Sequence, residues 1–400
     1  MSNVSSTSMN TARFTRLALI VGLAALVIAV IGLFLSGAAL FFQAYLFAFV
    51  FWLGISLGSL ALLLLYFVVN GRWGLAIRRV TEAAAGSIWV MAILFIPLVF
   101  GIPYLYPWAR AGGLGENPHL EFKAAYLNTP FFLVRAVIYF AVWMGLAYLV
   151  NRTISRLQGS GPTERQAAHG RMQAMGAASL IAFVLTVTFA SIDWIMSLNP
   201  LWTSTAFGLV MIVGQVLTAL SFALLLLNLL PALSLGHRWT SDTTPIPYKD
   251  LGALLLTFVM GWMYLQYFQF LVMWGANIPR EVIWYQDRNT GGWQVLSWII
   301  VIFQFVLPFL VLLSGRVRHN LRTLAGLGGM LLVVHLISTF WHIKPAFSPG
   351  AFAISWLDVV MPIAIGGVWL AGFFYTLQRR PALTRADELV LEAAPQKAHA

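Results

Sequence analysis

Two ionisable residues lie within long apolar runs of the sequence and are candidates for proton transfer. Asp193 lies in TFASIDWIMSLNPLW and His335 in VVHLISTFWHIKP. A charged side chain at the centre of a bilayer costs roughly 2.5–3.5 kcal/mol on insertion scales, so each is a functional candidate. A carboxylate and a neutral imidazole at similar depth could accept protons from a bound quinol. The alternatives are an interfacial aspartate that faces water and a histidine satisfied within the core.

Three further residues near the same side could contact a quinone. Trp194 would form an apolar wall beside Asp193. Gln266 and Gln269 are three residues apart in MYLQYFQFLVMWGANIP and therefore share one face of a helix. Their amides could bind a quinone carbonyl, or they could form hydrogen bonds between helices. We expect neither a buried arginine beside Asp193 nor a second buried histidine in this layer.

A second set of polar residues could carry protons across the membrane. The predicted path consists of Glu82, Gln215, Thr218, Gln304 and Asp250. Glu82 could instead pair with Arg78 or Arg79 on a solvated face, and Asp250 could cap the start of a helix. The three residues near mid-depth could simply join neighbouring helices. Asp358, one turn inside the last run, is expected to extend its carboxylate to water.

Ten long apolar runs must position these residues. The chain has 400 residues, of which 60% are hydrophobic and 9% charged, and its mean hydropathy is +0.83. This composition predicts an all-α polytopic membrane protein, because a span needs about 20 apolar residues to cross the hydrocarbon. By count alone, the runs could form two four-helix bundles plus flanking helices. The predicted spans are residues 17–35, 40–70, 86–107, 131–151, 174–196, 203–231, 250–275, 293–314, 321–341 and 354–377.

The composition also excludes several cofactors and partners. The chain contains no cysteine, which excludes disulfides and cysteine-ligated iron–sulfur clusters. Only His335 lies clearly within an apolar run, so a haem held by two facing imidazoles is not expected, and the sequence predicts no metal site. The net charge of +11 does not indicate a nucleic acid, since the cations gather on alternate loops.

The distribution of cations predicts the orientation in the membrane. Of the 24 lysines and arginines, 18 fall on the side of the N-terminus. The six on the other side are Arg110, Lys123, Arg135, Arg280, Arg288 and Lys344. Cytoplasmic loops carry such an excess, so both termini are expected in the cytoplasm. We expect a cytoplasmic segment at 1–16, a membrane domain at 17–377 whose first helix is not cleaved, and a cytoplasmic tail at 378–400.

Several strings of the sequence together resemble one family of membrane proteins. They are RRVTEAAAG, YLNTPFFLVRAVIYFAVW, SIDWIMSLNPLWTSTAFG, LQYFQFLVMWGANIPREVIWYQDRNTGGW and VLPFLVLLSGRVRHN. They look like the NrfD-like, polysulphide-reductase-type membrane subunits of alternative complex III, and the length is similar to that of the smaller of the two large subunits. The resemblance runs from about residue 40 to residue 345, and the segments occur in the family's order.

The resemblance implies an activity, a set of partners and a location. The complex would lie in the bacterial cytoplasmic membrane and oxidise menaquinol or ubiquinol. Electrons would pass to an iron–sulfur subunit and then to multihaem cytochrome c subunits, beside a larger homologous membrane subunit. This chain would hold no haem or iron–sulfur cluster itself. It would contribute quinone contact, proton conduction or anchoring of the redox subunits.

Two other interpretations of the sequence stay open. Ten continuous apolar spans with few buried charges would also be compatible with a purely structural membrane anchor. A secondary transporter would instead need helices broken by Gly or Pro at mid-span and a charged site at the midplane. The prolines here gather at the ends of the spans, which does not favour a transporter.

Overall fold

The computed structural model describes residues 2–110, 121–157, 162–232 and 248–379, and within these ranges the chain is helical and has no strand. Ten of the described helical segments are long and apolar enough to cross a membrane, and each predicted span coincides with one of them. The predicted all-α polytopic fold is therefore confirmed. The helices are α1 (Ser2–Ser36), α2 (Ala38–Val69), α3 (Arg72–Ala85), α4 (Ile88–Leu105), α5 (Thr129–Leu157), α6 (Pro162–Trp194), α7 (Phe207–Ala232), α8 (Tyr248–Ala276), α9 (Pro279–Asn289), α10 (Trp293–Ile300), α11 (Leu307–Leu313), α12 (Gly315–Arg318), α13 (Leu321–Ile343) and α14 (Leu357–Gln378).

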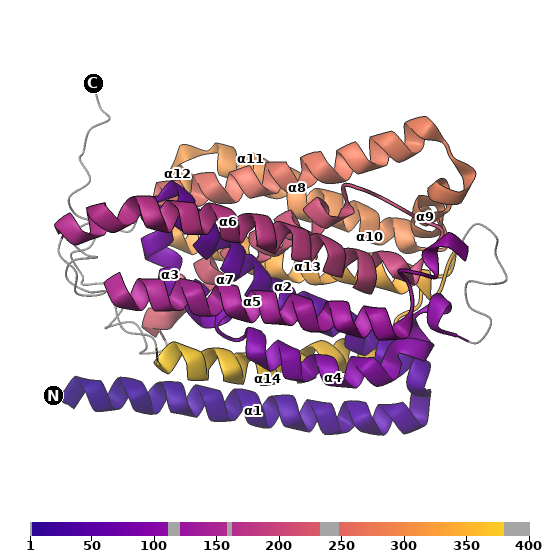
Figure 1. Cartoon of the computed structure of the whole chain (residues 1–400), viewed down its shortest axis with the longest axis horizontal. Coiled ribbons are helices and arrows are strands. Elements are labelled where there is room, and N and C mark those ends of the chain that lie inside the picture. Colours follow the sequence, from indigo (N-terminus) through magenta and orange to yellow (C-terminus); the bar gives the residue numbers. More distant parts are fainter. Residues whose placement is uncertain (1, 111–120, 158–161, 233–247, 380–400) are drawn as a thin grey trace.

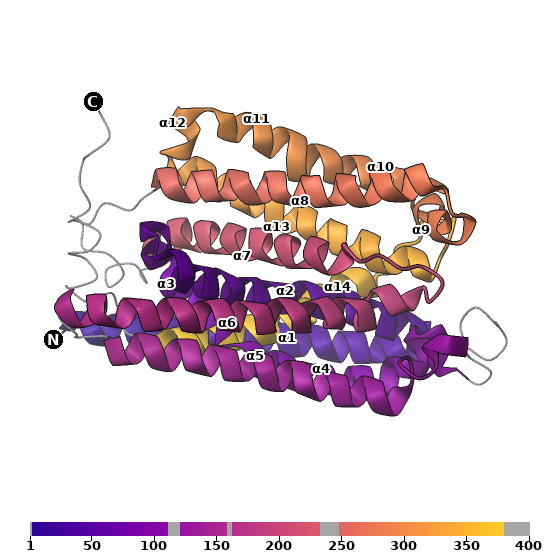
Figure 2. The same cartoon turned by 45° about the horizontal axis from the view of Figure 1, so that its top comes forward.

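The long helices form two bundles with a flanking pair. The first bundle contains α2, α4, α5 and α6, and the second contains α7, α8, α13 and the segment formed by α10 and α11. The central helices α2 and α7 pack against each other and join the bundles, with α5 and α6 on one side and α8, α10 and α11 on the other (Figure 2). Helices α1 and α14 pack along each other, and α14 packs on α2 (Figure 1). The arrangement agrees with the two bundles expected from the number of spans.

The centre of the molecule is built from α2 and from the glycines that let it approach α7. Helix α2 is buried along most of its length, whereas α1 leaves most of its apolar side chains exposed. A Cβ atom on Gly58 would lie 2.0 Å from the carbonyl oxygen of Gln215 on α7. Only a residue without a side chain fits there, which explains the pair Gly54 and Gly58 in α2.

Helix α3 does not appear among the predicted spans, and it lies within the protein at one end of the bundles. Its apolar residues recur with a helical period, and α3 packs against α2, α14 and α7. Arg78 and Glu82 form the predicted ion pair, with 3.2 Å between Nε and Oε1. Their side chains are buried, so the expected solvated face is wrong. The start of α1 and the end of α14 lie at this same end, which we name the α3 end (Figure 1).

Helix α9 marks the opposite end, which we name the α9 end. The chain leaves α8 through Asn277, whose φ of 45° lies in the left-handed region that asparagine tolerates. Pro279 then begins α9 at a position where the missing N–H is not needed. The short amphipathic helix that follows lies across the ends of α8 and α10 (Figure 1). It brings charged and aromatic residues to the end of the second bundle.

The span that contains α10 and α11 has an irregular turn in its middle. Residues Val301–Val306 form a π-helix between the two α-helices. Pro308 lies two residues after the π-helix and has no N–H to donate back along the helix. Such a missing donor favours a local change of helical winding. Gln304 lies in this turn and is fully buried.

Candidate functional site

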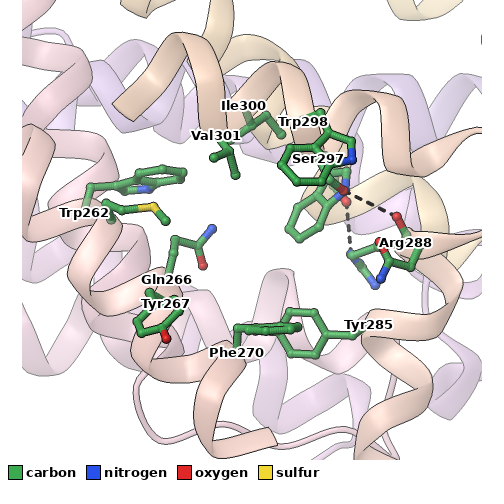
Figure 3. Close-up of a pocket in the computed structure, with 13 residues that line it drawn as sticks. Trp262, Gln266, Tyr267, Phe270, Tyr285, Arg288, Ser297, Trp298, Ile300 and Val301 are labelled. Atoms are coloured by element: carbon green, nitrogen blue, oxygen red, sulfur yellow. Dashed lines mark hydrogen bonds between the residues drawn. The ribbon is translucent and has the colours of Figure 1, made fainter. Parts of the chain in front are cut away.

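The second bundle contains a cavity of about 430 Å³ at the α9 end. It lies between α8, α9 and α10, whose side chains surround it (Figure 3). Trp341 of α13 forms part of its wall. The lining side chains are mostly aromatic or apolar, and the four polar residues that are not aromatic are Gln266, Arg288, Asn289 and Ser297. The lining residues are Trp262, Met263, Gln266, Tyr267, Phe270, Tyr285, Arg288, Asn289, Ser297, Trp298, Ile300, Val301 and Trp341.

Arg288 is the cation of this cavity, and the backbone holds it in place. Its Nη1 donates to the carbonyl of Trp284 at 2.8 Å, and its Nε and Nη2 donate to the carbonyls of Trp341 and His342 at 3.1 and 2.8 Å. The guanidinium carbon lies 3.6 Å from the centre of the Trp284 ring, a favourable cation–π distance. Among the described residues no carboxylate forms an ion pair with Arg288. The cavity wall therefore carries a positive charge whose direct contacts are carbonyl dipoles and aromatic faces.

The ionisation of the cavity at neutral pH follows from the burial of its groups. Burial lowers the pKa of Arg288 to about 9, although the neighbouring Asp287 and Tyr285 act in the opposite direction. Burial also raises the pKa of Tyr285 to about 12, while Gln269 and Arg288 lower it in part. At pH 7 the guanidinium is thus protonated and the phenol neutral. Both groups are hydrogen-bond donors.

The two glutamines predicted to contact a quinone have different positions. The amide of Gln266 points into the cavity (Figure 3). Gln269 is buried behind the wall, where its Nε2 donates to the hydroxyl of Tyr285 at 3.2 Å and its Oε1 accepts from Ser204 at 3.0 Å. Gln266 can therefore contact a ligand directly, whereas Gln269 orients the phenol of Tyr285.

Asp193 lies in the first bundle and has the partner that sequence analysis did not expect. Arg135 of α5 donates from Nε and Nη2 to both carboxylate oxygens, at 2.7 and 2.9 Å, and Tyr139 donates to Oδ2 at 2.7 Å. Asp193 is fully buried, so the alternative of an aspartate facing water is also wrong. Arg135 is further fixed by the carbonyl of Tyr126 at 2.8 Å and by the ring of Phe131. This bidentate pair satisfies both oxygens of the carboxylate.

Trp194 follows Asp193 and packs within an aromatic cluster of the first bundle. Its ring lies 5.2 Å from Phe95 and 5.9 Å from Phe140 between centres. Neither Asp193 nor Trp194 lines the large cavity. The structure therefore separates these two predicted site residues from Gln266.

His335 lies in the second bundle, on the other side of α2 from Asp193. Its Nδ1 is 3.4 Å from Nε2 of Gln304 in the π-helix, and its ring packs near Phe51 of α2. Phe49, two residues earlier on α2, packs instead against Trp194. The two predicted proton acceptors thus face different sides of one helix and share no hydrogen-bond partner among the described residues. The structure does not bring them into one site.

Two other buried groups correct the sequence predictions. His342 is a second buried histidine, and its Nδ1 lies 2.7 Å from the carbonyl of Ser338. Asp358 does not extend to water, because it is buried and pairs with Lys344 at 3.1 Å. The same Lys344 donates to Gln43 at 3.4 Å. This cluster ties the ends of α2, α13 and α14 together.

The remaining residues of the predicted proton path do not form one connected chain of hydrogen bonds within the described part of the protein. The Thr218 hydroxyl donates to the carbonyl of Gly214 at 2.7 Å within its own helix. Glu82 pairs with Arg78, and Asp250 is exposed in the first turn of α8. Oε1 of Gln215 is buried and has no hydrogen-bond partner among the described residues.

Comparisons with known proteins do not identify the chain. No family model matches it, and a search of curated proteins finds no match. The site therefore has to be interpreted from its own geometry.

The large cavity was missed in the sequence because Arg288 was counted among the loop cations. One signal was present: Trp284 and Arg288 are four residues apart in a segment that can form a helix, so the guanidinium can lie on the indole. The cavity combines aromatic walls with an amide, a phenol and a guanidinium as donors. Such a cavity can hold a flat apolar ring and bind the oxygen atoms at its edges.

Proposed function

We propose that the chain is a membrane subunit of a quinol:electron-acceptor oxidoreductase of the alternative complex III type, and that the cavity at the α9 end binds the quinone head group. The observation that carries this proposal is the position of Arg288, Tyr285 and Gln266 around one aromatic cavity. The strings that resemble the NrfD-like family support the same interpretation.

The size and the walls of the cavity suit a quinone. Ligand sites for small molecules commonly measure about 300–1,000 Å³, and the cavity has about 430 Å³. Three of its lining side chains, Tyr267, Phe270 and Trp298, are also exposed on the surface of the bundle. A ligand with an apolar tail could therefore keep its ring inside the cavity while the tail extends along this surface.

The donors are placed for a ring that has an oxygen on two edges. Gln266 projects from α8 on one side of the cavity, and Arg288 lies across it on α9 (Figure 3). A quinone carbonyl accepts hydrogen bonds, and a protonated guanidinium stabilises the negative charge that such an oxygen gains on reduction. In this proposal the chain binds and orients the quinone, and either menaquinone or ubiquinone would fit the chemistry.

The partners and the orientation form part of the same proposal. With the α3 end in the cytoplasm of a bacterial cell, the cavity lies near the periplasmic face. Electrons would leave through the iron–sulfur subunit and the multihaem cytochrome c subunits, beside the larger NrfD-like subunit. Proton conduction through this chain would use Gln304 and His335, which the structure places in contact.

A binding measurement with the cavity variant Gln266→Leu tests the proposal. The amide of Gln266 has no hydrogen-bond partner among the described residues, so the change leaves the protein's own contacts in place. A lost hydrogen bond is worth about 0.5–1.5 kcal/mol, so affinity for a short-chain quinone should fall by roughly 2–13-fold. Quenching of tryptophan fluorescence in the purified full-length protein measures it.

Thr257→Val is the matched control, because Thr257 is an exposed residue of the same helix outside the cavity. It should bind the quinone as the unmodified protein does. Equal affinities of Gln266→Leu and the unmodified protein would overturn this assignment of the cavity.

A structural anchor is the second candidate function, and one observation favours it. Asp193 is the most deeply buried acid among the described residues. Both of its carboxylate oxygens accept hydrogen bonds from Arg135 or Tyr139, which indicates a structural role. An anchor would bind no quinone, so the same binding measurement separates the two candidates.

A further inference from the structure

Two residues that line one small cavity in the centre of the molecule each have a buried polar atom without a partner among the described residues. The two atoms are Nε1 of Trp194, from the end of α6, and Oε1 of Gln215, from the middle of α7. Both residues line a cavity of about 20 Å³, together with Ser191 and apolar residues of α2 and α6. One atom is a hydrogen-bond donor and the other an acceptor.

We propose that this cavity is a binding site for a single water molecule. The water accepts a hydrogen bond from the indole N–H of Trp194 and donates one to Oε1 of Gln215. Its second hydrogen can point to the hydroxyl of Ser191, which donates to the carbonyl of Val187 at 2.8 Å and still has lone pairs to accept. Buried waters make about three hydrogen bonds, and a cavity of about 10–15 Å³ is enough for one.

The chemistry of the walls favours water over an empty space. Cavities lined by apolar groups alone stay dry, whereas a cavity with two or more polar partners holds water. The indole N–H and the amide oxygen are buried, and leaving both without a partner would be costly. The direct bond between them is not formed in the structure, and a bridging water satisfies both at once.

The position of the site gives the water a structural role. Trp194 belongs to the first bundle and Gln215 to the second, and Leu53 and Leu57 of α2 line the cavity between them. The contact of α2 with α7 at this level is close and apolar, with Gly54 and Gly58 facing Gln215. The bridged pair therefore fixes the register of α6 relative to α7. This inference does not depend on the proposed quinone site.

A double-mutant cycle on the purified full-length protein tests the bridge. Trp194→Phe and Gln215→Leu should each lower the melting temperature, since each leaves the water with one partner fewer. In the double variant the melting temperature should fall by clearly less than the sum of the two single shifts. The second change removes a group whose water-mediated partner the first change has already removed. Additive shifts would overturn the proposal.

A matched cycle controls for the loss of any buried indole. The N–H of Trp369 donates to Oγ of Ser56 at 2.8 Å and does not face this cavity. Trp369→Phe combined with Gln215→Leu should therefore give additive shifts. Coupling of the same size in this control would show a general loss of packing and would count against the bridge.

A map of the unmodified protein at a resolution that shows waters gives an independent readout, which does not need the variants to fold. Density for one atom about 2.7–3.2 Å from both Trp194 Nε1 and Gln215 Oε1 is the expected result. A cavity without density, or a direct contact between the indole and the amide, would overturn the proposal.

Discussion

At the scale of single residues, the surroundings of Asp193 indicate that it stabilises the fold. Each carboxylate oxygen accepts from Arg135, and one also accepts from Tyr139. A proton acceptor needs a lone pair directed at its substrate, and these oxygens are directed at the protein. Replacing one partner of such a buried pair leaves the other as an uncompensated charge.

Asp193→Asn should therefore destabilise the protein strongly. Breaking a buried ion pair by removing one partner costs about 3–5 kcal/mol. Thermal unfolding of the purified protein should show a large drop in the melting temperature. Asp250→Asn is the control, because the carboxylate of Asp250 is exposed and surface changes usually stay within about 0.5 kcal/mol. If Asp193→Asn and Asp250→Asn have the same melting temperature, the ion pair does not hold the first bundle together.

Quinone binding at the large cavity should depend on pH through Arg288. Its pKa in the folded protein is about 9, below its ordinary value of 12.5. The guanidinium is charged at lower pH, so affinity should be constant between about pH 6 and pH 8 and should fall as the pH rises through about 9. Titrations of a short-chain quinone at several pH values measure this.

Stability and quinone affinity should change in opposite directions above about pH 9, so unfolding does not account for the loss of affinity. The folded state disfavours protonated Arg288, so this group destabilises the fold below about pH 9, and that cost decreases as the pH rises from about 9 to 12.5. Deprotonation of Arg288 thus weakens binding without destabilising the protein. Unchanged affinity above pH 9 would show that the quinone does not contact the guanidinium.

The sequence indicated that Asp193 is a buried candidate, but it indicated neither the partner of Asp193 nor the burial of Arg288. Asp193 was recognised because a carboxylate in an apolar run is costly, and this argument needs no structure. Arg135 was not recognised as its partner, because it lies 58 positions earlier in the chain and near the end of its span. Such pairings depend on the packing of α5 against α6, which hydropathy does not report.

At the scale of helices, the close approach of α2 and α7 gives a sharp test of the fold. A Cβ atom on Gly58 would lie 2.0 Å from the carbonyl oxygen of Gln215, so the two helix backbones would have to separate. Gly58→Ala should destabilise the protein by about 1–3 kcal/mol, as overpacking of a core does. Thermal unfolding measures the effect.

Gly145→Ala is the matched control for this change. Gly145 lies in α5, and a Cβ atom there would meet nothing within 4 Å. Alanine favours a helix over glycine by roughly 0.5–1 kcal/mol, so this variant should be as stable as the unmodified protein or slightly more stable. A Gly58→Ala variant as stable as Gly145→Ala would contradict the close packing of α2 and α7.

The spans were predictable from the sequence because long apolar runs determine them, but two helical features were not. Helix α3 has a low mean hydropathy along its length, and its burial comes from contacts with α2 and α14. The direction of the Gln304 side chain in the π-helix before Pro308 does not follow from the sequence. The mean hydropathy of a long run reports neither feature, because the burial of α3 and the direction of Gln304 depend on neighbouring helices.

At the scale of the whole molecule, burial sharpens the asymmetry of charge between the two ends. Three of the six cations assigned by sequence to the outer side are Arg135, Arg288 and Lys344, and all three are buried within the protein. Each has partners inside the fold, so none of them adds to the charge exposed at the α9 end. Of the α3-end cations that the structure describes, Arg78 is buried as well, so burial removes more cations from the surface of the α9 end than from that of the α3 end.

This asymmetry predicts that the α3 end faces the cytoplasm, because the positive-inside rule depends on cations in short loops. The start of α1 and the end of α14 both lie at the α3 end (Figure 1). A reporter that is active only in the cytoplasm should work when fused at the C-terminus, and one that is active only in the periplasm should fail there. The opposite pattern should hold for fusions after Ala276, where α8 ends at the α9 end. Periplasmic activity at the C-terminus would reverse the orientation and place the large cavity at the cytoplasmic face, away from the cytochrome subunits that the proposed function requires.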